Sequence, residues 1–306
     1  MEIRELEYFV AIWQEGNLSR AAEKLFITQP ALSRYLQRLE DELGLLLFQR
    51  IGRRMRLTYA GERYLAYAQR ILQTRREMET EMADIRREEK GRLRVGIPPF
   101  RCSFIMPAVL PAFRSQHPNI DVEIMEEAST ILDEALVCGN IDLAFFSLSE
   151  KNARLNYEIL EEDQLYVILP KGHPLSSVAH TDPDGALSLT LEQLADETLI
   201  LQKHGQRQGQ YILSELSNRH IHPRKTIESS NIRAAALLAA NGYGVAFLSG
   251  GLLRHFEARD RCDAFRLSGC KAPLSFAAAT CAGSYVSSWA NDFIRFVREG
   301  IRSGTI

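Results

Sequence analysis

Four arginines stand close together near the N-terminus, in the run Arg50-x-x-Arg53-Arg54-x-Arg56 beside Gly52. Guanidinium groups form paired hydrogen bonds with phosphate oxygens and enter narrow minor grooves, so this run suits contact with a nucleic acid. Residues 20–56 contain eight lysines and arginines but only four aspartates and glutamates. A solvated basic loop is the alternative interpretation.

A second group of polar side chains precedes this run. Those that could contact base edges are Gln29, Pro30, Ser33, Arg34 and Arg38. Gln29 can form two hydrogen bonds with adenine, Arg34 can do so with guanine, and Pro30 can contact a thymine methyl group. Ser19 and Thr28 stand at predicted helix starts, so they either contact phosphates or only cap their helices. Arg50 and Arg54 are candidates for phosphate contacts, and internal pairing with Glu40 or Glu42 is the alternative for Arg50.

Four further stretches, at residues 98–103, 129–130, 202–207 and 229–231, each end a predicted strand and begin a predicted helix. Ligands in open α/β sheets bind at such junctions, and free N–H groups at helix N-termini favour anions. Arg101, Lys203, His204 and Arg207 add positive charge there. The candidate ligand residues are Pro99, Phe100, Arg101, Cys102, Ser103, Ser129, Thr130, Phe146, Gln202, Lys203, His204 and Ser230. They predict a small anionic ligand, for which a carboxylate is one candidate.

Each of these assignments has a structural alternative. Ser103, Thr130 and Ser230 could serve only as helix caps, and isolated aromatic residues such as Phe100 and Phe146 more often belong to a core. Lys203 and His204 could simply be exposed.

Catalytic chemistry is not predicted. The histidines and Asp142 form no nucleophile–base constellation, no HExxH motif and no phosphate-binding glycine loop, so we expect neither an enzyme, nor a metal site, nor a cofactor. Five cysteines without a CxxC pair do not form a disulfide framework and indicate free thiols. A redox sensor that uses Cys102, Cys262 or Cys270 remains the alternative function.

The elements that position the basic residues are short helices. Apolar residues recur at helical spacing over 6–13, Gly16 and Asn17 end that run, and Ser19 is expected to cap a second helix. Thr28 is expected to cap a third helix with Pro30 in its first turn. This is the helix-turn-helix pattern. Residues 59–87 then form one long amphipathic helix, whose narrow apolar stripe suits a coiled-coil seam and predicts a dimer.

After Gly91 strands alternate with helices. Strands are predicted at 93–97, 120–126, 143–146, 165–169, 198–201 and 245–248, with helices near 105–116, 131–138, 208–219 and 232–241 and a last helix around Trp289 and Phe293. This alternation predicts an α/β sheet with helices on both faces.

Length and composition agree with this organisation. A chain of 306 residues suggests two domains or one large domain. A composition of 45% hydrophobic and 25% charged residues excludes a disordered, collagenous or membrane protein. The net charge of −2 excludes a uniformly basic nucleic-acid binder. The start MEIRELEYFV lacks the features of a signal peptide, and no stretch approaches about 20 apolar residues, so we expect a cytoplasmic protein.

About sixty contiguous residues resemble the LysR-type transcriptional regulators. The matching segments are LEYFV (6–10), NLSRAAEKL (17–25), TQPALS (28–33), LExELG (39–44), LFxR (47–50) and RMRLTxAG (54–61). Further matches are LRVGI (93–97), GNIDLA (139–144), HPL (173–175) and GxGV (242–245), so the resemblance spans essentially the whole chain. Departures from the family pattern are Ser249-Gly250-Gly251, where a proline is common, and the polar stretch 182–190.

The resemblance implies a DNA-binding regulator with a winged helix-turn-helix at 1–58, a dimerising linker helix at 59–90 and a periplasmic-binding-protein-like effector domain at 91–306. That domain has two α/β subdomains, at 91–164 with 268–306 and at 165–267, with a small-molecule effector between them. The implied partners are double-stranded DNA, the effector and further copies of the chain, usually as a tetramer. Arg53 resembles the family's minor-groove arginine.

Overall fold

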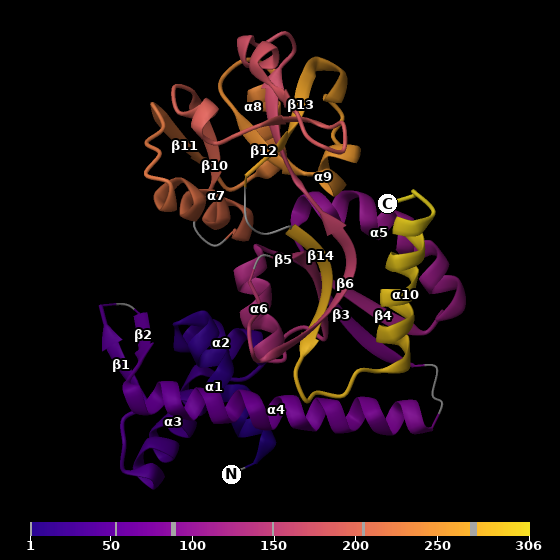
Figure 1. Ribbon diagram of the computed structural model, residues 1–306. Helices are drawn as coiled ribbons and strands as arrows, with labels where there is room; N and C mark the ends of the chain where they lie inside the picture. Colours follow the sequence, from indigo (N-terminus) through magenta and orange to yellow (C-terminus); the bar gives the residue numbers. More distant parts are fainter. Residues whose placement is uncertain (1, 53, 87–89, 149, 204–205, 270–273) are drawn as a thin grey trace. The chain divides into compact units, whose positions relative to one another are not determined.

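The computed structural model describes residues 2–52, 54–86, 90–148, 150–203, 206–269 and 274–306. The chain divides into two compact units, Met1–Arg87 and Glu88–Ile306. Figure 1 shows the elements of each unit in chain order. Within the described residues, no helix is long and apolar enough to span a membrane.

The first unit is a winged helix-turn-helix followed by a long helix. Its elements are α1 (Ile3–Glu15), α2 (Leu18–Lys24), α3 (Gln29–Leu43), β1 (Phe48–Ile51), β2 (Arg54–Leu57) and α4 (Tyr59–Ile85). Ala21 and Ala22 are buried against Phe9 and Leu32, which allows α1, α2 and α3 to cross closely. The hairpin of β1 and β2 turns at Gly52, which has a φ of 61°. The predicted helix-turn-helix and the long helix are therefore confirmed.

The predicted cap of α2 was wrong by two residues. Asn17 is the N-cap, and its side chain accepts hydrogen bonds from the amides of Ser19 (2.8 Å) and Arg20 (3.2 Å). Both residues are good capping types, but the helix begins at Leu18, which places Ser19 inside its first turn.

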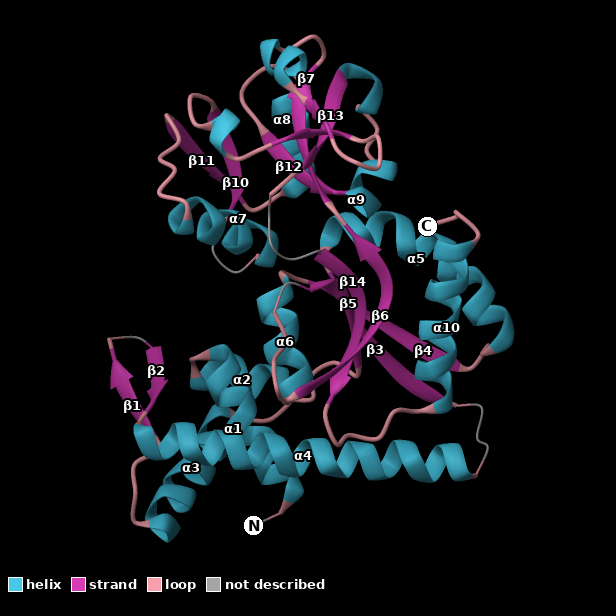
Figure 2. Ribbon diagram, viewed as in Figure 1, coloured by secondary structure: helices cyan, strands magenta, loops and turns pink. Residues whose placement is uncertain are grey.

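The second unit contains two mixed sheets (Figure 2). The first sheet has the strand order β4-β3-β5-β14-β6, with β3, β4 and β5 parallel and β14 antiparallel to both its neighbours. Its strands are β3 (Gly91–Ile97), β4 (Ile120–Glu126), β5 (Leu143–Leu148), β6 (Leu155–Asp163) and β14 (Leu274–Cys281). Its helices are α5 (Pro99–Gln116), α6 (Ser129–Val137) and α10 (Ser288–Arg302).

Helices cover both faces of this first sheet (Figure 2). Phe146 of β5 packs with Leu132 and Leu136 of α6, whereas its neighbour Phe145 meets Phe293 of α10. Successive strand residues point to opposite faces, so this alternation buries the strand on both sides.

The second sheet has the order β12-β7-β13-β9-β8, and a parallel pair, β10 and β11, adjoins it through a bridge between Leu199 and Val245. The strands are β7 (Leu165–Pro170), β8 (His180–Thr181), β9 (Leu187–Leu189), β10 (Thr198–Gln202), β11 (Lys225–Ser229), β12 (Ala246–Ser249) and β13 (Cys262–Leu267). The helices are α7 (Arg207–Asn218), α8 (Ile232–Ala240) and α9 (Gly250–Arg254), with short 3-10 turns at Pro174–Val178, Glu192–Leu194 and Arg259–Arg261. The polar stretch at 182–190 contains β9, which pairs with both β8 and β13.

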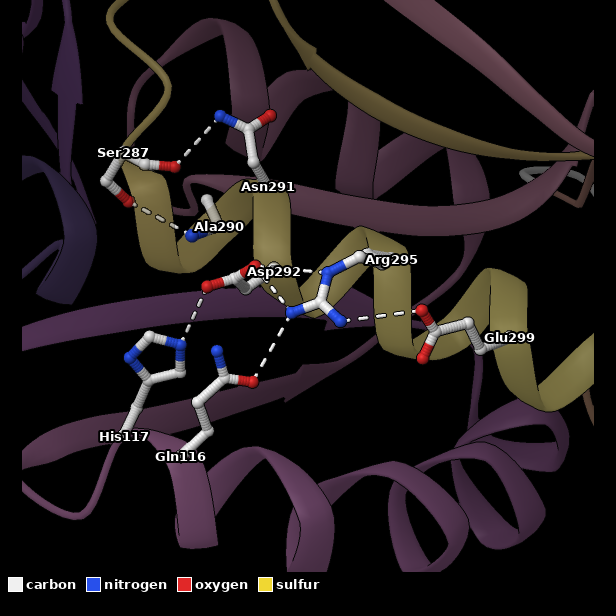
Figure 3. Close-up of polar contacts among 8 residues, drawn as sticks. All are labelled: Gln116, His117, Ser287, Ala290, Asn291, Asp292, Arg295 and Glu299. Atoms are coloured by element: carbon white, nitrogen blue, oxygen red, sulfur yellow. Dashed lines mark hydrogen bonds and ion pairs between the residues drawn. The ribbon is translucent and has the colours of Figure 1, made fainter.

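The chain passes between the two sheets twice. It leaves the first sheet at Asp163 and enters the second at Leu165; it leaves the second at Leu267 and re-enters the first at Leu274. Helix α10 then packs on the end of α5. Figure 3 shows Asp292 accepting hydrogen bonds from Arg295 (2.7 Å) and meeting the ring of His117 (2.9 Å). These contacts hold the returning chain on the first sheet.

Candidate functional site

The polar side chains at the start of α3 are exposed. Thr28 is the N-cap residue, but its side chain makes no capping hydrogen bond, so its hydroxyl does not fill the structural role proposed as the alternative. Gln29, Pro30 and Arg34 are exposed and Ser33 is half-buried. The first two turns of this helix therefore present an amide, an apolar ring and a guanidinium to solvent.

Arg38 differs from these residues, because it is paired inside the unit. Its guanidinium hydrogen-bonds the carboxylate of Glu5 in α1 and lies 3.8 Å from that of Glu42. An arginine held in this way is less available to a base than Arg34, although 61% of its side chain remains exposed.

The arginines of the hairpin are exposed. Arg50 pairs in register with Met55, and Arg54 lies opposite Ile51. The Glu40 carboxylate accepts hydrogen bonds from the backbone amides of Leu47 (2.6 Å) and Phe48 (2.9 Å). In the described part of the chain, Glu40 forms no ion pair with Arg50. Arg53 lies outside the described residues.

A cavity of about 160 Å³ lies in the second unit, where the two sheets face each other. Its walls come from the first turns of α5, α6, α7 and α8 and from the ends of β5 and β10. The residues that line it are Pro98, Pro99, Phe100, Arg101, Ala128, Ser129, Ser147, Gln202, Gln206, Arg207, Gln208, Ser230, Asn231, Ile232 and Leu252. This set contains two arginines and no carboxylate.

Four helix N-termini thus meet at one cavity. The N-cap residues Pro98, Ala128 and Gln206 provide no side-chain cap, whereas Asn231 accepts the amide of Ala234 (3.1 Å). Uncapped N-termini leave N–H groups and the positive end of the helix dipole without a partner from their own helix. Their convergence makes the cavity suited to an anion.

The structure brings six of the candidate ligand residues together and separates the others. Those that line the cavity are Pro99, Phe100, Arg101, Ser129, Gln202 and Ser230. Outside the lining are Cys102, Ser103, Thr130, Phe146 and Lys203. Ser103 donates to the Phe100 carbonyl (2.7 Å), and Phe146 is fully buried behind Arg207. His204 lies outside the described residues.

Arg101 belongs to a helix and not to the loop that precedes it. It lies in the first turn of α5 and is 96% buried, since its relative exposure is 4%. Prolines at 98 and 99 suit the N-cap and first helical positions, so α5 begins before the predicted start. The guanidinium donates to Ser147 (3.0 Å) and Ser249 (3.2 Å) and lies 3.5 Å from Asp163. Burial lowers the pKa of Arg101 to about 10, although Asp163 opposes the shift.

Arg207 is a different kind of cation. It is 8% exposed, its guanidinium lies 4.5 Å from the ring centroid of Phe146, and it forms an ion pair with Asp133 of α6. Its Nη1 atom is buried and, within the described parts of the chain, has no hydrogen-bond partner. An unsatisfied donor of this kind costs free energy, which a bound acceptor would recover. The sequence placed Arg207 among the cations of this region but did not distinguish it from the others.

Three of the described thiols are poorly suited to redox chemistry. Burial raises the pKa of Cys102 to about 11, and Glu126 adds to the shift. Burial also raises the pKa of Cys138 and that of Cys262. Since the thiolate is the reactive form, these shifts oppose peroxide sensing by these residues. Cys270 lies outside the described residues. Among the described residues, no cluster of three or more His, Cys, Asp or Glu side chains could hold a metal ion.

Two family models match the chain. Residues 3–62 match the bacterial regulatory helix-turn-helix protein, lysR family, and residues 86–302 match the LysR substrate binding domain. Curated relatives include the transcriptional regulator BenM of Acinetobacter baylyi, 30% identical over 250 residues (81% of this chain, 80% of BenM). The RuBisCO operon transcriptional regulator of Allochromatium vinosum is 28% identical over 249 residues, with 81% and 80% covered.

Solved structures agree with the same fold. A full-length OxyR variant from Pseudomonas aeruginosa has a TM-score of 0.69 and 27% identity, over 99% of this chain and 95% of OxyR. Full-length BenM has a TM-score of 0.58 and 26% identity, over 99% and 98%. The LysR-family regulator CbnR in complex with its target DNA has a TM-score of 0.60 over 98% of this chain and 99% of CbnR, and at 21% identity the likeness is one of fold.

The buried position of Arg101 generates a stability prediction. The substitution Arg101→Met leaves the Asp163 carboxylate buried without its cationic partner, so we expect the free energy of unfolding to fall by about 3–5 kcal/mol. Arg92→Met is the matched control: that arginine also pairs with carboxylates but is 61% exposed, so its loss should cost at most about 1 kcal/mol. Urea unfolding followed by circular dichroism measures both, and equal losses would contradict the assigned role of Arg101.

Proposed function

The chain belongs to the LysR family of DNA-binding transcriptional regulators, and we propose that a small anionic effector bound in the 160 Å³ cavity controls it. Arg207 carries the proposal: it lines a cavity bounded by four helix N-termini, and its buried Nη1 has no hydrogen-bond partner among the described residues, whose side chains also bring no carboxylate to the cavity lining. Phe100, Ile232 and Leu252 add an apolar wall, which suits an organic anion such as a carboxylate.

The other polar groups of the cavity suit orientation of the ligand. Ser129, Ser230 and Asn231 lie at the starts of α6 and α8, and Gln202 ends β10. Hydroxyl and amide groups can donate or accept, so they fit the polar substituents of a metabolite. Arg101 is held by Ser147, Ser249 and Asp163, so we assign it to positioning the walls and Arg207 to the anion.

At the DNA we propose a division between base edges and phosphates. Gln29, Pro30, Ser33 and Arg34 lie at the N-terminal end of α3, which is the part of a recognition helix that meets base edges. The groups assigned to phosphates are Ser19, Thr28, Arg50 and Arg54, and the one assigned to the minor groove is Arg53. Arg38 is assigned to pairing with Glu5 rather than to a base.

The proposed self-association uses α4. Five apolar side chains at coiled-coil spacing are exposed on this helix: Tyr67, Ile71, Met78, Met82 and Ile85. An apolar seam of this kind is stable in water when a second copy covers it. We propose a linker at 59–90 that forms a dimer and, as in the family, a tetramer of two dimers, with the head at 1–58 and the effector domain at 91–306.

The anionic effector is tested by thermal shift. We expect at least one compound from a panel of small carboxylates, aromatic acids, amino acids and sugar phosphates to raise the melting temperature, because a ligand at 100 times its Kd stabilises the folded state by about 2.7 kcal/mol. Arg207→Gln should abolish that shift. A neutral amide analogue that stabilises the protein as well as its acid would contradict the proposal.

The division at the DNA is tested with two arginine variants. Arg34→Ala should lose about 1–3 kcal/mol of binding to the preferred sequence and relax specificity there. Arg54→Ala should weaken binding to every sequence alike and reduce the salt dependence of the binding constant. Fluorescence anisotropy at several salt concentrations, on sequences selected from a random library, separates the two; equal and sequence-independent losses would contradict the assignment.

The linker seam is tested by charge insertion. Met78→Glu places a carboxylate in the proposed seam, so sedimentation velocity should show dissociation to a smaller species at micromolar protein. Glu79→Gln, one residue along the helix and outside the apolar stripe, is the control and should leave the assembly unchanged. Retention of the same sedimentation coefficient by Met78→Glu would exclude the seam.

A further inference from the structure

A second cavity lies beside the first. It has a volume of about 650 Å³ and is bounded by α6, by the segment after β5 and by α7. The residues that line it are Thr130, Asp133, Glu150, Lys151, Asn152, Arg207, Gln210, Tyr211, Ser214 and Glu215. Arg207 lines both cavities, and Asp133 lines only the second. The Arg207–Asp133 ion pair therefore stands at the boundary between them.

This ion pair joins the two halves of the effector domain. Asp133 is on α6, which packs on the first sheet, and Arg207 begins α7, which follows β10 beside the second sheet. Another ion pair that joins the halves, Arg254 with Glu161, involves the chain crossing and its neighbour α9, and Arg101 of the first half donates a hydrogen bond to Ser249 of the second there. The Arg207–Asp133 ion pair thus links the two halves across the effector cleft, away from the segments where the chain passes between the sheets.

The Arg207–Asp133 ion pair leaves some of its hydrogen-bonding atoms unused. The side chains of Arg207 and Asp133 are 8% and 14% exposed. Each keeps a buried atom, Nη1 in Arg207 and Oδ1 in Asp133, for which the residues that the structure describes offer no hydrogen-bond partner. Burial raises the pKa of the Asp133 carboxyl even though Arg207 opposes the shift. A buried pair with unused bonds contributes little to stability, because desolvation offsets its attraction.

The guanidinium of Arg207 cannot form a two-bond contact with an effector carboxylate while it is paired with Asp133. The ring of Phe146 supports the face of the guanidinium, and Asp133 occupies Nη2. A two-bond contact between a carboxylate and both terminal nitrogens of Arg207 requires Nη2, which Asp133 holds. The negative charge of Asp133 also offsets the positive charge of Arg207, which would otherwise attract an anion.

We propose that Asp133 is an internal competitor of the effector. Without the effector, the Asp133 carboxylate pairs with Arg207 across the cleft. An anionic effector displaces this carboxylate from Arg207 and so breaks the ion pair that links α6 to α7. This inference rests on the anionic effector site proposed above. Effector binding then loosens the cleft at α6 and α7, while the pairs at the chain crossing stay in place. The two halves of the domain gain freedom to change their separation only when the anion is bound.

The test compares anion binding by three variants, with acetate and inorganic sulfate as probes and chloride at equal ionic strength as the reference. Asp133→Asn keeps the shape of the side chain and removes its charge, so we expect it to bind the probes about tenfold more tightly than the unsubstituted protein in thermal-shift titrations. Glu161→Gln removes another ion pair between the halves, outside the cavity, and should leave the affinity unchanged. Arg207→Gln should bind neither probe.

Hydrogen exchange gives a second measurement that does not depend on affinity. In Asp133→Asn the amides of residues 129–137 and 207–212 should exchange faster without any anion, to the extent that the probes produce in the unsubstituted protein. Equal or weaker probe binding by Asp133→Asn, or unchanged exchange in these segments, would overturn the competitor role alone. Absence of saturable binding in both proteins would overturn the anionic site and the competitor with it.

Discussion

The effector domain depends on one buried cation. Arg101 extends from the first turn of α5 to the point where the chain crosses between the sheets, and burying a guanidinium is costly unless every donor finds a partner. Its partners come from both halves: Ser147 from the first sheet, Ser249 from the second, and Asp163 from the crossing. The ring of Phe276 lies 4.0 Å from its central carbon. Because Arg101 and Asp163 belong to the first half and Ser249 to the second, these contacts fix where the halves meet.

The Arg101–Asp163 ion pair explains the two glycines at 250 and 251, which depart from the family pattern. A Cβ at Gly250 would lie 2.9 Å from the Asp163 carboxylate, and one at Gly251 would lie 3.3 Å from both Asp163 and Arg101. The amide of Gly251 also donates to Asp163 at 3.3 Å. The absence of side chains lets the start of α9 approach the buried pair, and this approach determines the floor of the neighbouring cavity.

The two arginines of the cavity therefore have different uses. Arg101 has four partners that the protein itself supplies, so it serves the architecture, whereas Arg207 has an unused donor and a carboxylate partner that is itself incompletely bonded. Natural proteins leave such polar atoms unsatisfied mainly where another molecule uses them. This contrast supports the proposed assignment of ligand binding to Arg207, apart from the contacts that keep the domain folded.

Local patterns in the amino-acid sequence were sufficient for the head, for α4 and for the α/β character of the rest, because apolar spacing, caps and glycine turns act within a few residues. They missed β6, β8, β9, β13 and β14, and they gave no bounds for β11. Of these, β6, β13 and β14 acquire partners from distant parts of the chain, and β6 carries three charged residues, Glu158, Glu161 and Glu162, that interrupt its apolar pattern. They located the four helix starts of the cavity but could not rank their side chains. Whether a cation is enclosed like Arg101 or left with a free bond like Arg207 depends on neighbours more than 40 residues away, and long-range packing alone selects those neighbours.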